Sequence, residues 1–216
     1  MSEYYSLYRG ASAEIEEKKS RFIATIEPAC TEEEAADFIA RCKKKYYDAR
    51  HNCTAFIVGD AGEIMRSNDD GEPSGTAGRP MLEVLSGAKV TNIVCVVTRY
   101  FGGTLLGTGG LIRAYQGAVK AALDECVIIH KLDGIMLIVT CDYNDSGKIT
   151  YMAASNKWNV MSTEYGEKVT FTILDETSKI PNIEKQIIDA TAAKAQIEQG
   201  KQVSYAVLDG EIKVFE

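Results

Sequence analysis

The sequence of 216 residues lacks any apolar stretch approaching about 18 residues, so it predicts no membrane-spanning helix. Its first residues show no basic start followed by an apolar run, and we therefore expect a cytoplasmic protein that does not associate with membranes. The six cysteines include no C-x-x-C pair, and only two histidines are present. We accordingly expect reduced thiols, no disulfide, no structural metal and no cofactor.

Positive charge is also scarce, because the formal net charge is −7. This balance argues against a protein that coats duplex DNA through bulk electrostatics. All eight arginines precede residue 114, and later cations are lysines only. Because the planar guanidinium suits phosphates and carboxylates, an anion site is expected in the first part of the chain, although arginines also form surface ion pairs.

The stretch from residue 90 to 117 organises the first part of the chain. Ile93 to Val97 is apolar at every position, which predicts a strand buried on both faces. A loop with five glycines follows, and apolar residues then recur at helical spacing. The loop fits neither the Walker pattern nor the dinucleotide fingerprint. Two interpretations stay open: an anion or ligand site, or a cramped corner of the fold.

Shorter patterns predict the neighbouring elements. Alternation over 11–17 and 21–27 predicts a hairpin. The segment Thr31-Glu-Glu-Glu34 is a capping box that predicts the start of a helix. The acidic start and basic end of this helix complement its dipole, and the alternative is a nucleic-acid patch.

A polar loop and a histidine add two further candidates. Asp69, Asp70 and Glu72 lie in a loop rich in glycine and proline, where they serve either a turn or a divalent cation. His51 lies two residues from Cys53 at the start of a predicted strand. A Cys–His nucleophile is one interpretation, and a structural or binding histidine is the favoured one because no orienting group or oxyanion hole is evident.

Two segments carry a specific resemblance to a known family. They are Asp69-Asp-Gly-Glu-Pro-Ser-Gly-Thr-Ala-Gly-Arg-Pro80 and Val97-Thr-Arg-Tyr-Phe-Gly-Gly-Thr-Leu-Leu-Gly107. Both resemble signature stretches of the IMPACT family in its bacterial YigZ-like branch, and His51-Asn-Cys-Thr-Ala-Phe56 resembles a weaker third one. The resemblance implies an N-terminal α/β domain similar to ribosomal-protein and elongation factor G domain IV folds. It also implies a link to translation, since eukaryotic relatives interfere with activation of an amino-acid-starvation kinase.

After residue 134 the hydrophobic pattern restarts and predicts the order β-α-β-β-α-β of a ferredoxin-like split unit. The predicted fold class is therefore α+β, with an IMPACT-type domain over residues 1–130 and a ferredoxin-like domain over 134–216. Asp133-Gly134 is a turn signal that predicts an interruption of regular structure. We therefore expect separate cores joined by a short linker from Lys131 to Gly134.

The sequence favours a binding or regulatory protein without catalytic activity, whose partners are RNA, the ribosome or a protein of the translation machinery. Arginines can hold phosphates, and the rings of Tyr100 and Phe101 offer surfaces that stack on bases. The alternative for these rings is that both are buried. The predicted site comprises Arg99 as the principal anion ligand together with Arg79, Arg113, Arg50, His51, Tyr100, Phe101, Gly102 and Gly103. The alternative for Arg99 is an internal ion pair with Asp69, Asp70 or Glu72 that ties the two unusual loops together. The alternative is an enzyme acting on a phosphorylated or carboxylated small molecule, with Asp69, Asp70, Glu72 and His51 as its polar groups. The oligomeric state stays open.

Overall fold

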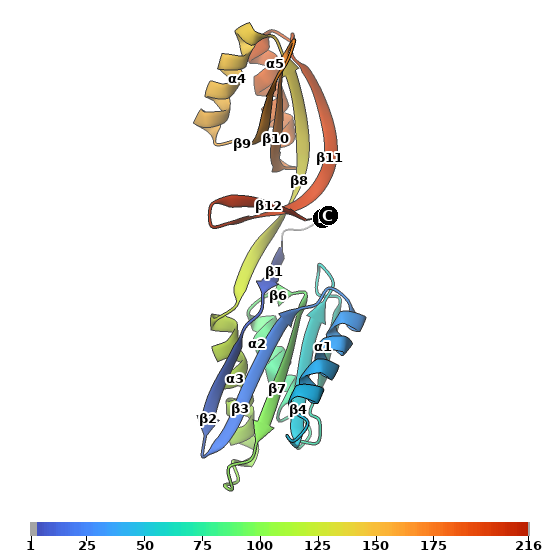
Figure 1. The fold of residues 1–216 in the computed structure, drawn as a ribbon, viewed down its shortest axis with the longest axis vertical. Helices are drawn as coiled ribbons and strands as arrows, with labels where there is room; N and C mark the ends of the chain where they lie inside the picture. The colour runs from blue at the N-terminus through green and yellow to red at the C-terminus, as the bar shows by residue number, and fades with distance from the viewer. Residues whose placement is uncertain (1–3, 216) are drawn as a thin grey trace. The chain divides into compact units, whose positions relative to one another are not determined.

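The computed structural model describes residues 4–215. The chain divides into two compact units, Tyr4–His130 and the part from Lys131 onward, each with hydrophobic clusters of its own. Figure 1 shows the mixture of helices and sheets in both units, so the predicted α+β class is confirmed. Within residues 4–215, the helices do not combine the length and apolar character needed to span a membrane.

The N-terminal unit contains seven strands and three helices before the chain leaves it. In order they are β1 (Tyr4–Arg9), β2 (Ser12–Glu17), β3 (Ser20–Pro28), α1 (Glu32–Lys45), β4 (His51–Val58), β5 (Ile64–Asn68), α2 (Gly78–Gly87), β6 (Val90–Thr91), β7 (Ile93–Tyr100) and α3 (Gly107–Asp124), followed by the start of β8. The predicted hairpin is β2–β3, and the predicted capping box begins α1. There the Glu34 N–H donates to Thr31 Oγ1 at 3.2 Å, and the Glu34 carboxylate accepts from the Cys30 N–H at 2.6 Å.

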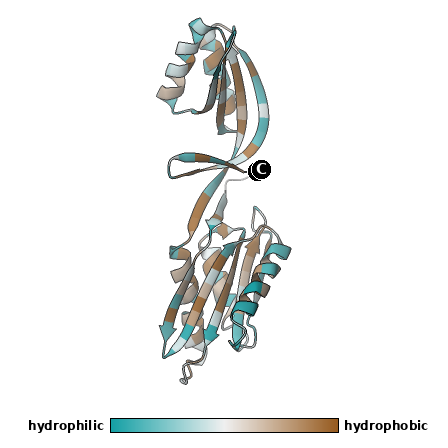
Figure 2. Cartoon of the chain, in the orientation of Figure 1, coloured by the Kyte–Doolittle hydropathy of each residue, from teal (hydrophilic) through white to brown (hydrophobic). Residues whose placement is uncertain are grey.

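The main sheet of this unit is antiparallel and covered on both faces. Its strand order is β2-β3-β7-β4-β5. Val94 and Val96 of β7 pack in the cluster formed with α1, whereas Cys95 and Val97 pack in the cluster formed with α2 and α3. The prediction that this strand is buried on both faces is therefore confirmed. In Figure 2 hydrophobic colour runs along these strands, while α1 is largely hydrophilic outside.

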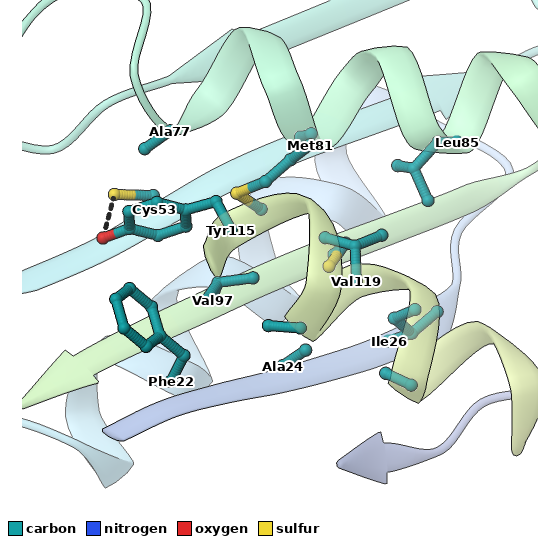
Figure 3. Packing of buried hydrophobic residues seen from close by; sticks show 14 of the residues in the cluster. Phe22, Ala24, Ile26, Cys53, Ala77, Met81, Leu85, Val97, Tyr115 and Val119 are labelled. Carbon is teal, nitrogen blue, oxygen red and sulfur yellow. Dashed lines mark hydrogen bonds between the residues drawn. The ribbon is translucent and has the colours of Figure 1, made fainter. Parts of the chain in front are cut away.

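Figure 3 shows how the helices α2 and α3 fill one face of the sheet. Met81 and Leu85 of α2 meet Tyr115 and Val119 of α3 above the strands. The ring of Tyr115 packs edge-on against Phe22, with centroids 5.2 Å apart. Tyr115 is fully buried, so its hydroxyl requires a polar partner inside the unit.

The C-terminal unit has the predicted order of elements. After β8 (Val127–Cys141) come α4 (Tyr143–Asn156), β9 (Asn159–Tyr165), β10 (Val169–Glu176), α5 (Ile180–Thr191), β11 (Gln196–Leu208) and β12 (Glu211–Phe215). The strands pair antiparallel in the order β9-β10-β8-β11-β12. The final hairpin has the register expected for a turn at Asp209-Gly210, because Val207 pairs with Ile212 and Tyr205 with Val214.

The predicted linker from Lys131 to Gly134 is wrong, because β8 runs unbroken through these residues. Gly134 is part of the ladder, where it lies opposite Glu176 of β10 and Val203 of β11. A Cβ atom at this position would lie 2.7 Å from the Tyr205 ring. The glycine therefore serves close side-chain packing inside a strand, and not the chain break that Asp-Gly usually signals.

Candidate functional site

The carboxyl end of β7 lies beside the starts of β3 and β4. Arg99 is opposite Phe22 on one side and His51 on the other, and Tyr100 is opposite Arg21. In open α/β sheets ligands gather beyond the carboxyl ends of parallel strands, a rule that would favour an anion site at Arg99. The rule does not apply at Arg99, because β7 pairs antiparallel with both of its neighbours, β3 and β4.

A cavity of about 460 Å³ opens at this end of the sheet, lined by Asp48, Arg50, His51, Arg99, Tyr100, Phe101 and Leu105. It brings together five of the predicted site residues from β4, its preceding turn and the end of β7. Phe101 is 54% exposed and Leu105 is 83% exposed, so the mouth of the cavity carries apolar surface open to solvent. The arrangement is an open surface pocket and not an enclosed chamber.

Arg99 does not have the accessible head group that an anion ligand requires. Its Nη1 donates to Glu72 Oε1 at 2.7 Å, and the two side chains are only 8% and 3% exposed. This is the alternative role for an arginine, an internal ion pair, and it joins the two unusual loops of the sequence. The guanidinium carbon also lies 5.4 Å from the Phe22 ring centroid and 5.7 Å from that of Phe101. Arg99 therefore supports the pocket from behind.

Glu72 continues this connection into the core. Its Oε1 also accepts from the Tyr115 hydroxyl at 2.9 Å, and that hydroxyl in turn accepts from Cys53 Sγ at 3.3 Å. Burial raises the pKa of the Cys53 thiol to about 12. A thiol held neutral in this way is a poor nucleophile, and its second contact is the Asp69 carbonyl at 3.0 Å. The interpretation of Cys53 as a nucleophile is therefore not supported.

Asp69 and Asp70 are used to shape their own loop. The carboxylate of Asp69 accepts three backbone N–H groups, from Gly75, Ala77 and Gly78, which holds the loop at the start of α2. Asp70 accepts from Lys43 Nζ and from the Asn52 N–H, each at 2.7 Å. Burial alone would raise the pKa of Asp70, but these two hydrogen bonds outweigh it and lower the pKa. Of the two sequence interpretations, the turn accounts for both carboxylates.

His51 is oriented by the same loop. Its Nδ1 lies 2.9 Å from the Asp70 carbonyl oxygen. A carbonyl can only accept, so Nδ1 carries the proton and Nε2 of the neutral ring is an acceptor. Among residues 4–215, no group of three or more His, Cys, Asp or Glu side chains is placed to hold a metal ion.

The glycines after β7 serve the backbone geometry of a tight corner. A Cβ on Gly102 would lie 2.0 Å from the Lys19 carbonyl carbon, and the Gly102 N–H donates to Ser20 Oγ at 3.1 Å. Gly103 has a φ of 86°, a conformation that glycine adopts without strain. Of the two interpretations of the glycine loop, the cramped corner accounts for both residues.

Arg79 and Arg113 lie outside the pocket lining. Arg79 forms an exposed ion pair with Glu83 on α2 at 3.2 Å, and Arg113 is exposed on α3. Conversely, sequence reasoning missed Asp48 and Leu105 as pocket residues. Asp48 accepts from the Tyr100 hydroxyl at 2.7 Å, a contact between residues that are 52 positions apart and that no local pattern signals.

Exposed cations surround the pocket, and we call this set the basic end. The hairpin tip contacts the loop after β7 through Ser20 and Gly102, and α1 ends where Lys43 meets Asp70. In Figure 1 the turn between β2 and β3 and the end of α1 lie at the same end of the N-terminal unit. These segments, with the start of β3 and the turn before β4, carry Lys18, Lys19, Arg21, Lys43, Lys44, Lys45 and Arg50. Within the part of the chain that the structure describes, Lys18, Lys19, Lys44 and Arg50 form no ion pair.

Comparison with known families matches both units. The model of the Impact N-terminal domain matches residues 18–123, and a domain of unknown function, DUF1949, matches residues 139–194. The first match contains the whole pocket and every residue of the basic end.

Whole-length relatives and a solved structure agree with these matches. The chain is 37% identical to IMPACT family member YvyE of Bacillus subtilis, over 92% of this chain and 91% of that protein. It is 34% identical to IMPACT family member YigZ of Escherichia coli, over 83% and 89% of the two chains. A crystal structure titled as a hypothetical protein is similar with a TM-score of 0.59 at 31% identity, covering 93% of this chain and 98% of that one.

Proposed function

The chain belongs to the IMPACT family, and from this premise we propose that it is a cytoplasmic binding protein that regulates translation by contacting single-stranded RNA, free or on the ribosome. The observation that carries the proposal is the basic end, where seven exposed cations surround a pocket with an exposed aromatic ring. Lysines and arginines attract phosphates, and aromatic rings stack on unpaired bases.

The local charge of the basic end matters more for RNA binding than the net charge of the whole chain. The net charge of −7 repels nucleic acid at long range, but screening at physiological salt limits that repulsion to about 8 Å. The basic end also holds carboxylates, since Glu14 pairs with Arg21 and Asp70 with Lys43. Cations that form no ion pair among residues 4–215 are available to phosphates, and they include Lys18, Lys19, Lys44 and Arg50. We therefore expect moderate affinity that depends strongly on salt, and not the tight binding of a strongly basic protein.

The enzymatic alternative has less support because its proposed polar groups already have structural partners. Asp69 holds backbone N–H groups, Asp70 binds Lys43, and Glu72 binds Arg99 and Tyr115. Of this set, His51 keeps a free position within residues 4–215, Nε2, because its Nδ1 donates to the Asp70 carbonyl. A catalytic acid or base needs a free position facing its substrate, and an open pocket exposes the reaction to water.

The decisive experiment compares two triple variants of the full chain in RNA binding. Lys18, Lys19 and Lys44 are changed to alanine in the first, and Lys120, Lys185 and Lys194, which are exposed elsewhere, in the control. Both lose the same charge. If the first three lysines contact phosphates, the slope of log K against log salt falls in magnitude by roughly 2, since each contact contributes about 0.7. The control should keep the wild-type slope.

A pull-down from lysate, with and without nuclease, extends the test to the cellular partner. We expect ribosomal proteins and RNA to be recovered, and the basic-end variant to recover less of both than the control variant. Equal salt slopes for the two triple variants, or absence of RNA binding in the wild type, would refute the proposal.

A further inference from the structure

We propose that the pocket lined by Asp48, Arg50 and Phe101 selects an unpaired guanine base, an inference that rests on the proposed RNA-binding function. A volume of about 460 Å³ lies within the range of about 300–1,000 Å³ that is typical of small-ligand sites. One nucleotide fits such a space, whereas a duplex does not enter it. The site would therefore read a base that has left the stack of an RNA strand.

Phe101 supplies a fixed stacking surface. More than half of the residue is exposed, and the Arg99 guanidinium carbon lies 5.7 Å from its ring centroid. Arg99 cannot swing away, because Glu72 holds it at 2.7 Å in a buried ion pair. A ring supported in this way loses little conformational freedom when a base stacks on it. The buried pair thus has a positioning role for the pocket, even though Arg99 itself does not reach the ligand.

Asp48 supplies the selectivity for the base. Its Oδ1 accepts from the Tyr100 hydroxyl at 2.7 Å, which orients the carboxylate at the pocket wall. Its Oδ2 has no hydrogen-bond partner within residues 4–215. An ionised carboxylate only accepts hydrogen bonds. Guanine presents two adjacent donors, N1–H and the N2 amino group, whereas adenine, cytosine and uracil each place an acceptor beside a donor on the same edge.

Arg50 completes the site as the phosphate contact. It is exposed, it lines the pocket, and it forms no ion pair in the described part of the chain. A guanidinium at the wall of the same pocket can bind the phosphate of the nucleotide with two parallel hydrogen bonds. Phe101 therefore stacks on the face of the base, Asp48 accepts hydrogen bonds from its edge, and Arg50 binds the phosphate.

The test measures binding of the full chain to short oligouridines that carry a single central guanosine, adenosine or cytidine, at one fixed salt concentration. We expect the guanosine oligonucleotide to bind about 10-fold more tightly than the others, the discrimination typical of a bidentate base contact. Guanosine monophosphate should displace it and adenosine monophosphate should not, which shows whether the free nucleotide is recognised as well.

Asp48→Asn should abolish the preference for guanosine, because the amide presents a donor beside its acceptor. Asp37→Asn, which removes the same charge from an exposed position on α1, should leave the preference unchanged. Tyr100→Phe removes the hydroxyl that orients Asp48 and should reduce the preference by several-fold. Circular dichroism confirms that each variant is folded.

The outcomes separate the two proposals. Equal affinity of the wild type for all the oligonucleotides, or an unchanged preference in a folded Asp48→Asn variant, overturns the guanine inference while RNA binding by the basic end stands. Absence of any RNA binding overturns both.

Discussion

Arg99→Met tests whether the buried ion pair with Glu72 holds the two loops together. The substitution leaves a carboxylate that is 3% exposed without its cation, for which a loss of about 3–5 kcal/mol is typical. Within residues 4–215, Arg99 Nε has no hydrogen-bond partner, so removing this buried donor offsets about 1 kcal/mol of that loss. The free energy of unfolding should therefore fall by roughly 2–4 kcal/mol.

A matched control exists on α2, where Arg79 and Glu83 form an ion pair with side chains 79% and 56% exposed. Arg79→Met should cost less than about 1 kcal/mol, since exposed pairs contribute little. Denaturant unfolding followed by circular dichroism measures both. Fluorescence of Trp158, the single tryptophan, follows the core of the C-terminal unit and shows which unit has lost stability.

The double variant Arg99→Met with Glu72→Gln decides the cause. A neutral glutamine is not an uncompensated charge, so the double variant should be more stable than Arg99→Met alone. Two results would refute the reasoning: equal losses for Arg99→Met and Arg79→Met, or a double variant whose loss equals the sum of the two single losses.

Two further predictions concern the same unit. Gly102→Ala should lower the melting temperature clearly, because the added Cβ meets the Lys19 backbone. Gly109→Ala in α3 should leave the melting temperature unchanged or raise it, because the nearest atom to its added Cβ is 3.6 Å away. A thermal melt in which both variants behave alike contradicts the close approach of Gly102 to the Lys19 backbone. Alkylation of the native protein at pH 8, followed by mass spectrometry, should modify the exposed Cys30 first, while Cys53, whose pKa is raised to about 12, stays a thiol and reacts only after unfolding. Rapid labelling of native Cys53 would show that the contact with Tyr115 is not formed.

Several features of the fold follow from neighbouring residues alone, and these the sequence predicts well. The capping box at Thr31 satisfies N–H groups within one helical turn, and the Asp209-Gly210 turn sets the pairing of Val207 with Ile212. The apolar run from Ile93 to Val97 needs burial on both faces whatever covers it. In each case the information lies within a few positions of the element it specifies.

The pocket could be predicted only in part. Arg50, His51, Tyr100 and Phe101 could be selected from sequence because their side chains are cationic, titratable or aromatic. The pairing of β4 with β7 brings them together in the pocket. Asp48 carries no distinguishing pattern, and its role depends on a hydroxyl 52 positions away.

Tertiary structure alone decided what the most conspicuous residues do. From sequence, Arg99 could bind either an external anion or a carboxylate of its own chain. It binds Glu72, 27 positions away, because the folded loop buries that carboxylate beside it. From sequence, Gly134 could either end a strand or continue it. In the folded chain β8 continues through Gly134, and the Tyr205 ring packs against this position. Sequence patterns determine which surfaces must be buried, because burial depends on side-chain type. Which partner meets a buried charge or a missing side chain depends on contacts between distant segments, and these exist only once the chain has folded.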